Sequence, residues 1–186
     1  SYRRLCALGR LRRRAAPKQG SGRFVRPVRG VGRRLLHARN GGDLSGAHAG
    51  QKATLVIQAA KDPDGGNLDR IQVIKGWVGK DGQAQERVYD VAVSGGRTID
   101  ADGRSKTSVG STVDVANATW TNTIGAGEMI TVWKDPDFDP ALRAFYYVRV
   151  IEIPTPRWTA YDAKYFGIKM PAEVTMTTTE RAYTSP

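Results

Sequence analysis

The sequence is poor in the side chains that most often bind metal ions or form covalent cross-links. Its 186 residues include two histidines and a single cysteine, Cys6, which has no internal partner for a disulfide. The histidines, His37 and His48, stand eleven positions apart, whereas a hydrolytic metal centre gathers three or more histidine and carboxylate ligands. We therefore expect no catalytic residue, no metal site and no bound cofactor in this chain.

Several other features of known sites are also missing. No run of eighteen apolar residues occurs, which predicts that no helix of the chain spans a membrane. There is no G-x-S-x-G motif of a serine hydrolase, and the glycine-rich stretch at 94–104 lacks the lysine of a phosphate-binding loop. The acidic clusters at 62–69 and 135–140 do not fit the ligand spacing of a calcium loop. We expect their carboxylates to lie in turns between strands.

Positive charge is concentrated at one end of the chain. Residues 1–40 contain twelve arginines, one lysine and no acidic residue. Residues 41–186 contain sixteen basic and eighteen acidic side chains, so the net charge of +11 comes entirely from the first forty residues. The larger part of the chain therefore has no basic composition with which to attract a phosphate backbone.

Four interpretations of residues 1–40 stay open. The segment is typical of a tail that binds polyanions non-specifically by releasing counterions, and of an organelle transit peptide. A basic amphipathic helix on a membrane surface is disfavoured by Pro17, Pro27 and five glycines. Fourth, the segment is non-native, a frame-shifted translation of GC-rich DNA, since Arg, Ala, Gly and Pro supply 23 of its 40 residues. In each case we expect disorder, because apolar residues recur at no fixed period.

Residues 41–186 have the pattern of an antiparallel β domain. Short runs of β-branched and aromatic residues alternate with turns rich in Gly, Asp, Asn and Pro. The segments that predict strands are 53–61, 70–79, 86–94, 112–123, 128–135 and 141–154. Six or seven strands at this spacing predict a mainly β fold, an antiparallel sandwich or a strongly twisted sheet. The best helix candidate, at 159–168, is short.

Individual segments carry more specific predictions. The apolar run at 53–61 predicts a strand buried on both faces, and Asp81-Gly82 predicts a hairpin between two strands. The alternation in 86–94 places Tyr89 on one face and Asp90 on the other. The segment 141–154 has apolar or aromatic residues on both faces after its first turn, which predicts a central strand.

The densest mixture of aromatic and polar residues follows this last strand. After Pro154 and Pro156, which stiffen the chain, come the candidate ligand-binding residues Arg157, Trp158, Tyr161 and Asp162. An arginine beside aromatic rings on a rigid turn can hold an anionic or planar ligand. The alternative is structural: Trp158 and Tyr161 would pack into the core, and Arg157 would pair with an acid such as Asp162.

A resemblance to a known family runs through residues 41–186 in order. It is carried by "GGDL" at 41–44, "KDPDGGNLDRIQVIKGW" at 61–77, "VYDVA" at 88–92, "TNTIGA" at 121–126, "DPDFDPALRAFYYVRVIEIPTPRW" at 135–158 and "ERAYTSP" at 180–186. These segments resemble the C-terminal part of the bacterial family called domain of unknown function 3604. The resemblance covers none of residues 1–40, which supports a truncated or frame-shifted start.

The resemblance implies a function for a longer parent protein. Full-length members resemble metal-dependent hydrolases that cleave phosphate or sulfate esters, and their histidine-rich metal motifs lie near the N-terminus. Those motifs have no counterpart here. We therefore expect an inactive C-terminal fragment whose partner is the remainder of the hydrolase. The parent would hold a divalent metal, and family members with export signals imply a periplasmic or secreted location.

Two other classes of function stay open from the sequence. One is a small nucleic-acid-binding protein in which residues 1–40 form a basic arm on a neutral β domain. The other is a stand-alone β-sandwich that serves as an interaction module. A sandwich that folds alone should unfold cooperatively, whereas a fragment should expose an apolar face that its parent would cover.

Overall fold

A computed structural model of the chain describes residues 6–8, 41–43 and 50–186. In these residues the chain forms nine strands and one helix. The strands are β1 (Cys6–Leu8), β2 (Thr54–Ala60), β3 (Leu68–Val78), β4 (Ala84–Val93), β5 (Glu128–Lys134), β6 (Ala144–Glu152), β7 (Thr155–Pro156), β8 (Thr177–Thr178) and β9 (Arg181–Tyr183), and the helix is α1 (Trp158–Phe166). The nine-residue helix is too short to cross a bilayer, and none of the described residues forms a longer one.

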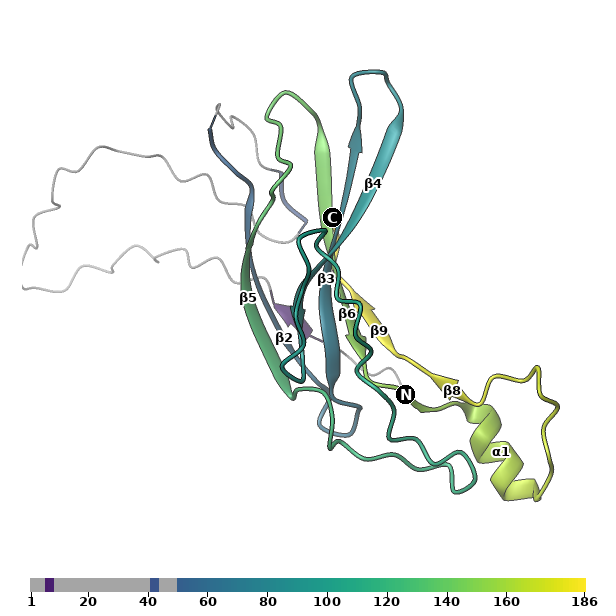
Figure 1. Cartoon of the computed structure of the whole chain (residues 1–186). Helices are drawn as coiled ribbons and strands as arrows, with labels where there is room; N and C mark the ends of the chain where they lie inside the picture. The colour runs from purple at the N-terminus through teal and green to yellow at the C-terminus, as the bar shows by residue number, and fades with distance from the viewer. Residues whose placement is uncertain (1–5, 9–40, 44–49) are drawn as a thin grey trace, which may run out of the picture.

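Two antiparallel sheets pack face to face (Figure 1). The smaller sheet has the strand order β1-β2-β5, and the larger sheet has the order β4-β3-β6-β9. The short strands β7 and β8 pair separately beside α1, which projects from one end of the sandwich (Figure 1). The prediction of a mainly β, antiparallel sandwich is therefore confirmed.

The hydrophobic core lies between the two sheets. Strands β2 to β6 contribute inward-facing residues to it, because successive side chains of a strand point to opposite faces. A register shift between Leu68 and Arg70 interrupts the alternation in β3. The buried side chains of this core are Ile57 and Ala59 from β2, Met129 from β5, Leu68, Ile71 and Val73 from β3, Tyr89 and Val91 from β4, and Val148 and Val150 from β6. The hydroxyl of Thr131 on β5 also donates to the carbonyl of Val91 on β4, at 3.1 Å, and ties the two sheets together.

Several local predictions are confirmed. Strand β6 lies between β3 and β9, so it is central in its sheet. The β3–β4 hairpin turns at Gly82, whose φ of 76° suits glycine, and its N–H donates to the carbonyl of Gly79 at 2.9 Å. The helix candidate forms α1, which ends at Gly167 with a left-handed φ of 63°.

Two strand predictions need correction. Residues 112–123 form no strand, only one isolated bridge between Asp114 and Thr119. The cause is local, because the backbone N–H and the side-chain amide of Asn117 both donate to the Asp114 carboxylate and close a turn. Strand β2 is buried on one face and not on both: Ile57 is buried, whereas Val56 points outward and is 36% exposed.

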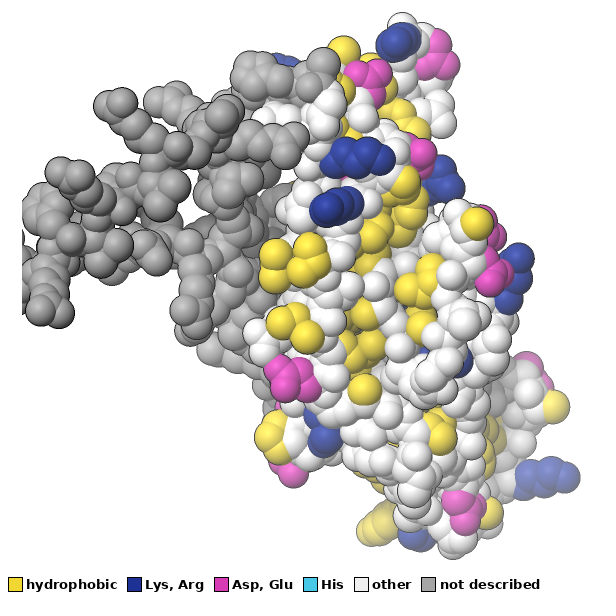
Figure 2. Space-filling model, turned by 60° about the vertical axis from the view of Figure 1, so that its left-hand side comes forward, with side chains coloured by type: hydrophobic (Ala, Val, Ile, Leu, Met, Phe, Trp, Pro, Cys, Tyr) yellow, Lys and Arg dark blue, Asp and Glu magenta, His cyan; other side chains and the backbone are white. Residues whose placement is uncertain are grey.

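The predictions for residues 1–40 fall mainly outside the described residues. The exception is β1, which pairs antiparallel with β2. The interpretations as a basic tail, a targeting segment or non-native sequence concern residues 1–40, of which the structure describes only residues 6–8. Both histidines also lie outside the described residues. Figure 2, in which the β2–β5 side is turned forward, shows hydrophobic side chains open at the surface there. They include Ile130, 68% exposed, and Val132, 62% exposed.

Candidate functional site

The four residues that the sequence singles out lie at the start of α1. Arg157 is the residue before the helix, in extended conformation, and its guanidinium lies 5.9 Å from the ring centroid of Trp158. Trp158 is 63% exposed and Tyr161 is 45% exposed. The alternative in which these two rings pack into the core is therefore wrong. Arg157 also forms no ion pair with Asp162, nor with another acid in the part of the chain that the structure describes.

The orientation of α1 follows from its small residues. Only Thr159 and Ala160 are buried in the helix, and the hydroxyl of Thr159 donates to the carbonyl of Thr175 at 2.6 Å. The Lys164 ammonium reaches the carbonyl of Asn117 at 2.9 Å and ties the helix to the turn at 114–119. Because the small side chains face inward, the large ones face the solvent.

These large side chains form what we call the α1 surface. Its members are Trp158, Tyr161, Tyr165, Phe166 and Ile168, each at least 45% exposed. The rings of Tyr165 and Phe166 meet edge to face with their centroids 4.9 Å apart. A group of exposed aromatic side chains on one short helix is typical of a surface that binds a protein or another ligand, because each ring can bury a large apolar area.

A second group of polar side chains lies between the two sheets. The ammonium of Lys75 on β3 lies 2.6 Å from the carboxylate of Asp135 and 2.8 Å from the carbonyl of Asp137. The side chains of Lys75 and Asp135 are 5% and 0% exposed. The hydroxyl of Tyr146 donates to Asp135 at 2.7 Å, and that of Tyr89 donates to Asp137 at 2.7 Å. We call these five residues the lysine cluster.

The lysine cluster keeps both tyrosines in their neutral form. Burial, and next the hydrogen bond to the Asp135 carboxylate, raise the pKa of Tyr146 above its ordinary value. Burial and the hydrogen bond to Asp137 raise the pKa of Tyr89 in the same direction. Ionised tyrosine would place a second negative charge beside a carboxylate, so the site is not suited to a tyrosinate base.

These shifts predict that the fold loses stability in alkali. A tyrosine whose pKa is raised by folding contributes stability that is complete below its unfolded pKa of about 10 and is lost as the pH rises further. We expect the free energy of unfolding to fall from about pH 10 upward, and to fall less steeply in Tyr146→Phe. Urea titrations of both proteins between neutral pH and strong alkali measure the two slopes. Equal slopes would contradict the assignment to Tyr146.

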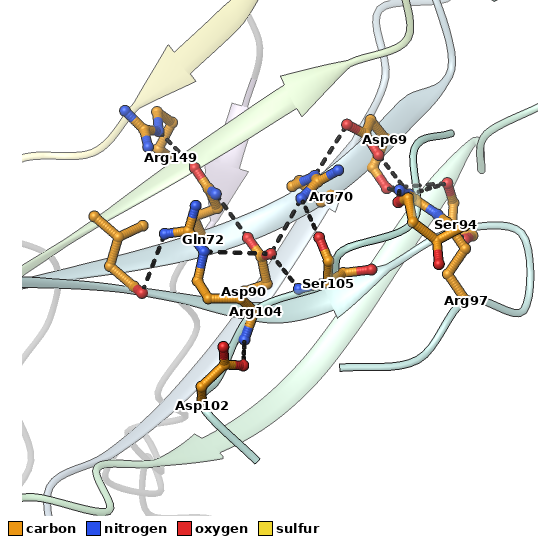
Figure 3. A network of polar contacts seen from close by, with 12 residues as sticks. Asp69, Arg70, Gln72, Asp90, Ser94, Arg97, Asp102, Arg104, Ser105 and Arg149 are labelled. Atoms are coloured by element: carbon orange, nitrogen blue, oxygen red, sulfur yellow. Dashed lines mark hydrogen bonds and ion pairs between the residues drawn. The ribbon is translucent and has the colours of Figure 1, made fainter. Parts of the chain in front are cut away.

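A third polar network lies at the other end of β3 and includes the loop after β4 (Figure 3). The Asp90 carboxylate, fully buried, accepts hydrogen bonds from Gln72 at 2.6 Å, from the backbone N–H of Ser105 at 2.8 Å and from Arg70 at 3.1 Å. Arg70 also pairs with Asp69 at 3.0 Å, and the side chain of Arg97 contacts the same carboxylate from the other side.

The Asp90 network extends to the surface through Arg104, whose Nε lies 4.0 Å from the Asp90 carboxylate, and through Arg149. The Nε of Arg149 on β6 donates to Gln72 at 2.8 Å, and Gln72 in turn donates to Asp90. The chain of contacts thus begins at a buried carboxylate and ends at a partly exposed guanidinium (Figure 3). These contacts hold together the side chains of Asp90, Gln72 and Arg149, which come from three different strands.

Sequence reasoning missed the lysine cluster and the Asp90 network. The sequence predicts a turn position for Asp135, which does follow β5, but the turn folds inward so that its carboxylate is fully buried. A signal was present in β3, where Lys75 shares a face with Ile71 and Val73 by the two-residue period. A lysine on the core face of a strand needs a buried acid as a partner.

The described residues do not fit the divalent metal that the family resemblance implies. No group of three or more His, Cys, Asp or Glu side chains in ranges 6–8, 41–43 and 50–186 is arranged to hold a metal ion. Asp135 and Asp137 are instead occupied by Lys75, Arg87 and the two tyrosines. We therefore derive no catalytic step through a metal from these residues.

Comparison with known proteins identifies a family. No curated protein and no solved structure matches the chain. One family model matches residues 37–186, and its description is "Protein of unknown function (DUF3604)". The match covers all the strands from β2 to β9, the lysine cluster, the Asp90 network and α1. The chain therefore belongs to the DUF3604 family.

Proposed function

We propose that this chain is the β-rich, non-catalytic part of a DUF3604 protein whose remaining part hydrolyses phosphate or sulfate esters with a divalent metal ion. The β-rich part braces the remaining part by docking the α1 surface against it. The observation that carries the proposal is the α1 surface, where four aromatic side chains and Ile168 are open to solvent on or directly after one short helix.

Physical reasoning favours docking over a solvated helix. Aromatic side chains bury about 150–250 Å² each when they are covered, so a partner that covers several of them gains much apolar burial. The helix is also held firmly in place, because Thr159 and Lys164 bond to two separate loops. A surface that is apolar and already ordered loses little conformational entropy on binding.

The hydrolase part of the proposal comes from the family resemblance. In the assembly, the candidate ligand residues Arg157, Trp158, Tyr161 and Asp162 would lie near the substrate entrance. The guanidinium of Arg157 is exposed beside Trp158 and would attract the anionic ester there. By family analogy the assembled protein works in the periplasm or outside the cell.

The test is an assembly experiment with the metal-binding part of a DUF3604 protein, produced separately and titrated with the full chain. We expect saturable binding and a blue shift of the Trp158 fluorescence, because docking removes this exposed ring from water. Tyr165→Ala should raise the dissociation constant at least tenfold, since Tyr165 is 83% exposed and is the most exposed member of the α1 surface.

A matched control is Tyr183→Ala, which removes an exposed tyrosine from β9. Assembly should be unchanged in this variant. Absence of binding, or equal binding by Tyr165→Ala, would show that α1 does not dock on the metal-binding part and would favour a stand-alone interaction module. Turnover of p-nitrophenyl phosphate or sulfate by the chain alone with Mn²⁺ would contradict the non-catalytic assignment.

A further inference from the structure

The outer face of the larger sheet carries aromatic and basic side chains that the proposed docking of α1 does not use. Val148 and Val150 of β6 point into the core. Because side chains alternate along a strand, Phe145, Tyr147 and Arg149 point outward from the same strand. Tyr183 on β9 is the register partner of Arg149 and lies on this outer face too.

Three rings form a row on this face. The centroids of Phe145 and Tyr147 are 6.5 Å apart with nearly parallel planes, and Tyr147 and Tyr183 are 6.4 Å apart. Phe145 is 52% exposed and Tyr183 is 55% exposed. The Phe145 ring lies over Gly76 of β3, where a Cβ would come within 2.3 Å of the ring. The glycine thus lets the ring lean across the neighbouring strand.

Arg149 is held in position at the end of this row. Its Nε donates to Gln72 at 2.8 Å, and Gln72 is fixed by the buried Asp90 at 2.6 Å. Neither terminal nitrogen of the Arg149 guanidinium has a hydrogen-bond partner in the part of the chain that the structure describes. The guanidinium therefore presents a pre-oriented pair of donors at the surface.

A second arginine stands diagonally across from the first. Arg181 pairs in register with Ile151, while Tyr183 pairs with Arg149, so the four residues form a two-by-two patch on adjacent strands. Arg181 is exposed. Within the described residues, neither arginine forms an ion pair. The patch therefore carries uncompensated positive charge directly beside an exposed ring.

We propose that this face, which we call the β6–β9 platform, binds an acidic oligosaccharide, with a sugar carboxylate or sulfate at Arg149 and Arg181. The apolar face of a pyranose ring would stack on Tyr183 and Tyr147, and the guanidinium fork of Arg149 would bind the anionic group through two hydrogen bonds. Positive charge matches the ligand's anionic group, and the rings match its apolar faces.

Charge favours a saccharide over a nucleic acid as the occupant. Residues 41–186 hold sixteen basic and eighteen acidic side chains, whereas nucleic-acid-binding domains are usually strongly basic. Two unpaired arginines suit a ligand that has one anionic group for each sugar or every few sugars. They do not suit the dense phosphates of a nucleic acid, whose affinity depends on many neutralised charges.

Isothermal titration calorimetry of the full chain with trigalacturonate in 0.15 M salt tests the proposal. We expect saturable binding that weakens at least tenfold in Tyr183→Ala and in Arg149→Lys, because lysine keeps the charge but not the fork. Tyr165→Ala on α1 is the matched control and should bind like the unmodified chain. Every variant contains residues 1–40, so any binding by that basic segment is the same in all of them.

Several outcomes would overturn the proposal. One is equal binding by Tyr183→Ala, and another is equal affinity for the neutral trisaccharide cellotriose, which would remove the role of the arginines. A third is tight binding of an oligothymidylate that Tyr183→Ala abolishes, which would make the platform a nucleic-acid site. The saccharide result is independent of the assembly test. Tyr183→Ala is expected to impair only saccharide binding, and Tyr165→Ala is expected to impair only assembly with the metal-binding part.

Discussion

Asp135→Asn is expected to destabilise the fold by about 3–5 kcal/mol, the largest effect of any single substitution considered for this chain. The carboxylate of Asp135 is fully buried and, among the residues that the structure describes, is the only acid side chain that contacts the Lys75 ammonium. The variant would leave a buried lysine whose remaining strong partner is the carbonyl of Asp137. Removing one member of a buried ion pair costs far more than the pair itself contributes, because the remaining charge stays desolvated.

Urea unfolding at neutral pH measures this effect, with two controls. Arg87→Ala removes a pair between exposed side chains, 43% and 49% open to solvent, and should cost less than about 1 kcal/mol. The double variant Lys75→Met, Asp135→Leu removes both charges and should recover most of the lost stability. A double variant no more stable than Asp135→Asn would show that the hydrogen bonds that Asp135 accepts from the Tyr146 hydroxyl and from the backbone N–H of Asp137 matter more than the ion pair.

The sequence was sufficient to predict the elements of the fold where local pattern and tertiary packing agree. The hairpin at Gly82 follows from its turn residues, and the central position of β6 follows from apolar residues on both faces. The helix α1 forms at the segment 159–168 and begins one residue earlier. The prediction failed at 112–123, where β-branched residues suggested a strand. There the side chain of Asp114 satisfies backbone and side-chain amide groups of Asn117 and makes a turn more favourable than a ladder.

The candidate sites were less predictable, because they depend on contacts between distant segments. Lys75 and Asp135 are sixty positions apart, and neither alone identifies the other. For Trp158 and Tyr161, composition is consistent both with a core position and with an exposed one. Trp158 and Tyr161 are exposed because Thr159 and Ala160 face inward instead. This orientation depends on residues 175 and 176, whose carbonyls accept hydrogen bonds from Thr159 and from the N–H of Arg157.

Asp90→Asn is the second substitution with a large expected effect, a loss of about 2–3 kcal/mol in the free energy of unfolding. The Asp90 carboxylate accepts three hydrogen bonds from donors on β3 and on the loop after β4. An asparagine keeps one acceptor oxygen but turns an N–H₂ group toward other donors. The effect is smaller than for Asp135, because Arg70 keeps a second carboxylate partner, Asp69.

The control for Asp90→Asn lies within the same network. The hydroxyl of Ser105 is buried without a hydrogen-bond partner in the described residues, whereas its backbone N–H binds Asp90. Ser105→Ala keeps that N–H and should leave the free energy of unfolding within about 0.5 kcal/mol of the original. A loss as large in Ser105→Ala as in Asp90→Asn would mean that packing around the loop, and not the carboxylate, supplies the stability.

The Asp90 variant also links the stability of the fold to the β6–β9 platform. In Asp90→Asn the donors of Arg70, Ser105 and Gln72 share one remaining acceptor oxygen, so Gln72 fixes the Nε of Arg149 less firmly. Trigalacturonate should then bind several-fold more weakly to Asp90→Asn, at a temperature where the variant is still folded, although residue 90 does not reach the ligand. Ser105→Ala should bind normally, since it leaves the Asp90–Gln72–Arg149 chain intact. Unchanged affinity in Asp90→Asn would mean that Arg149 binds the ligand without being held by Gln72 and Asp90. The charge of the guanidinium would then matter more than its orientation.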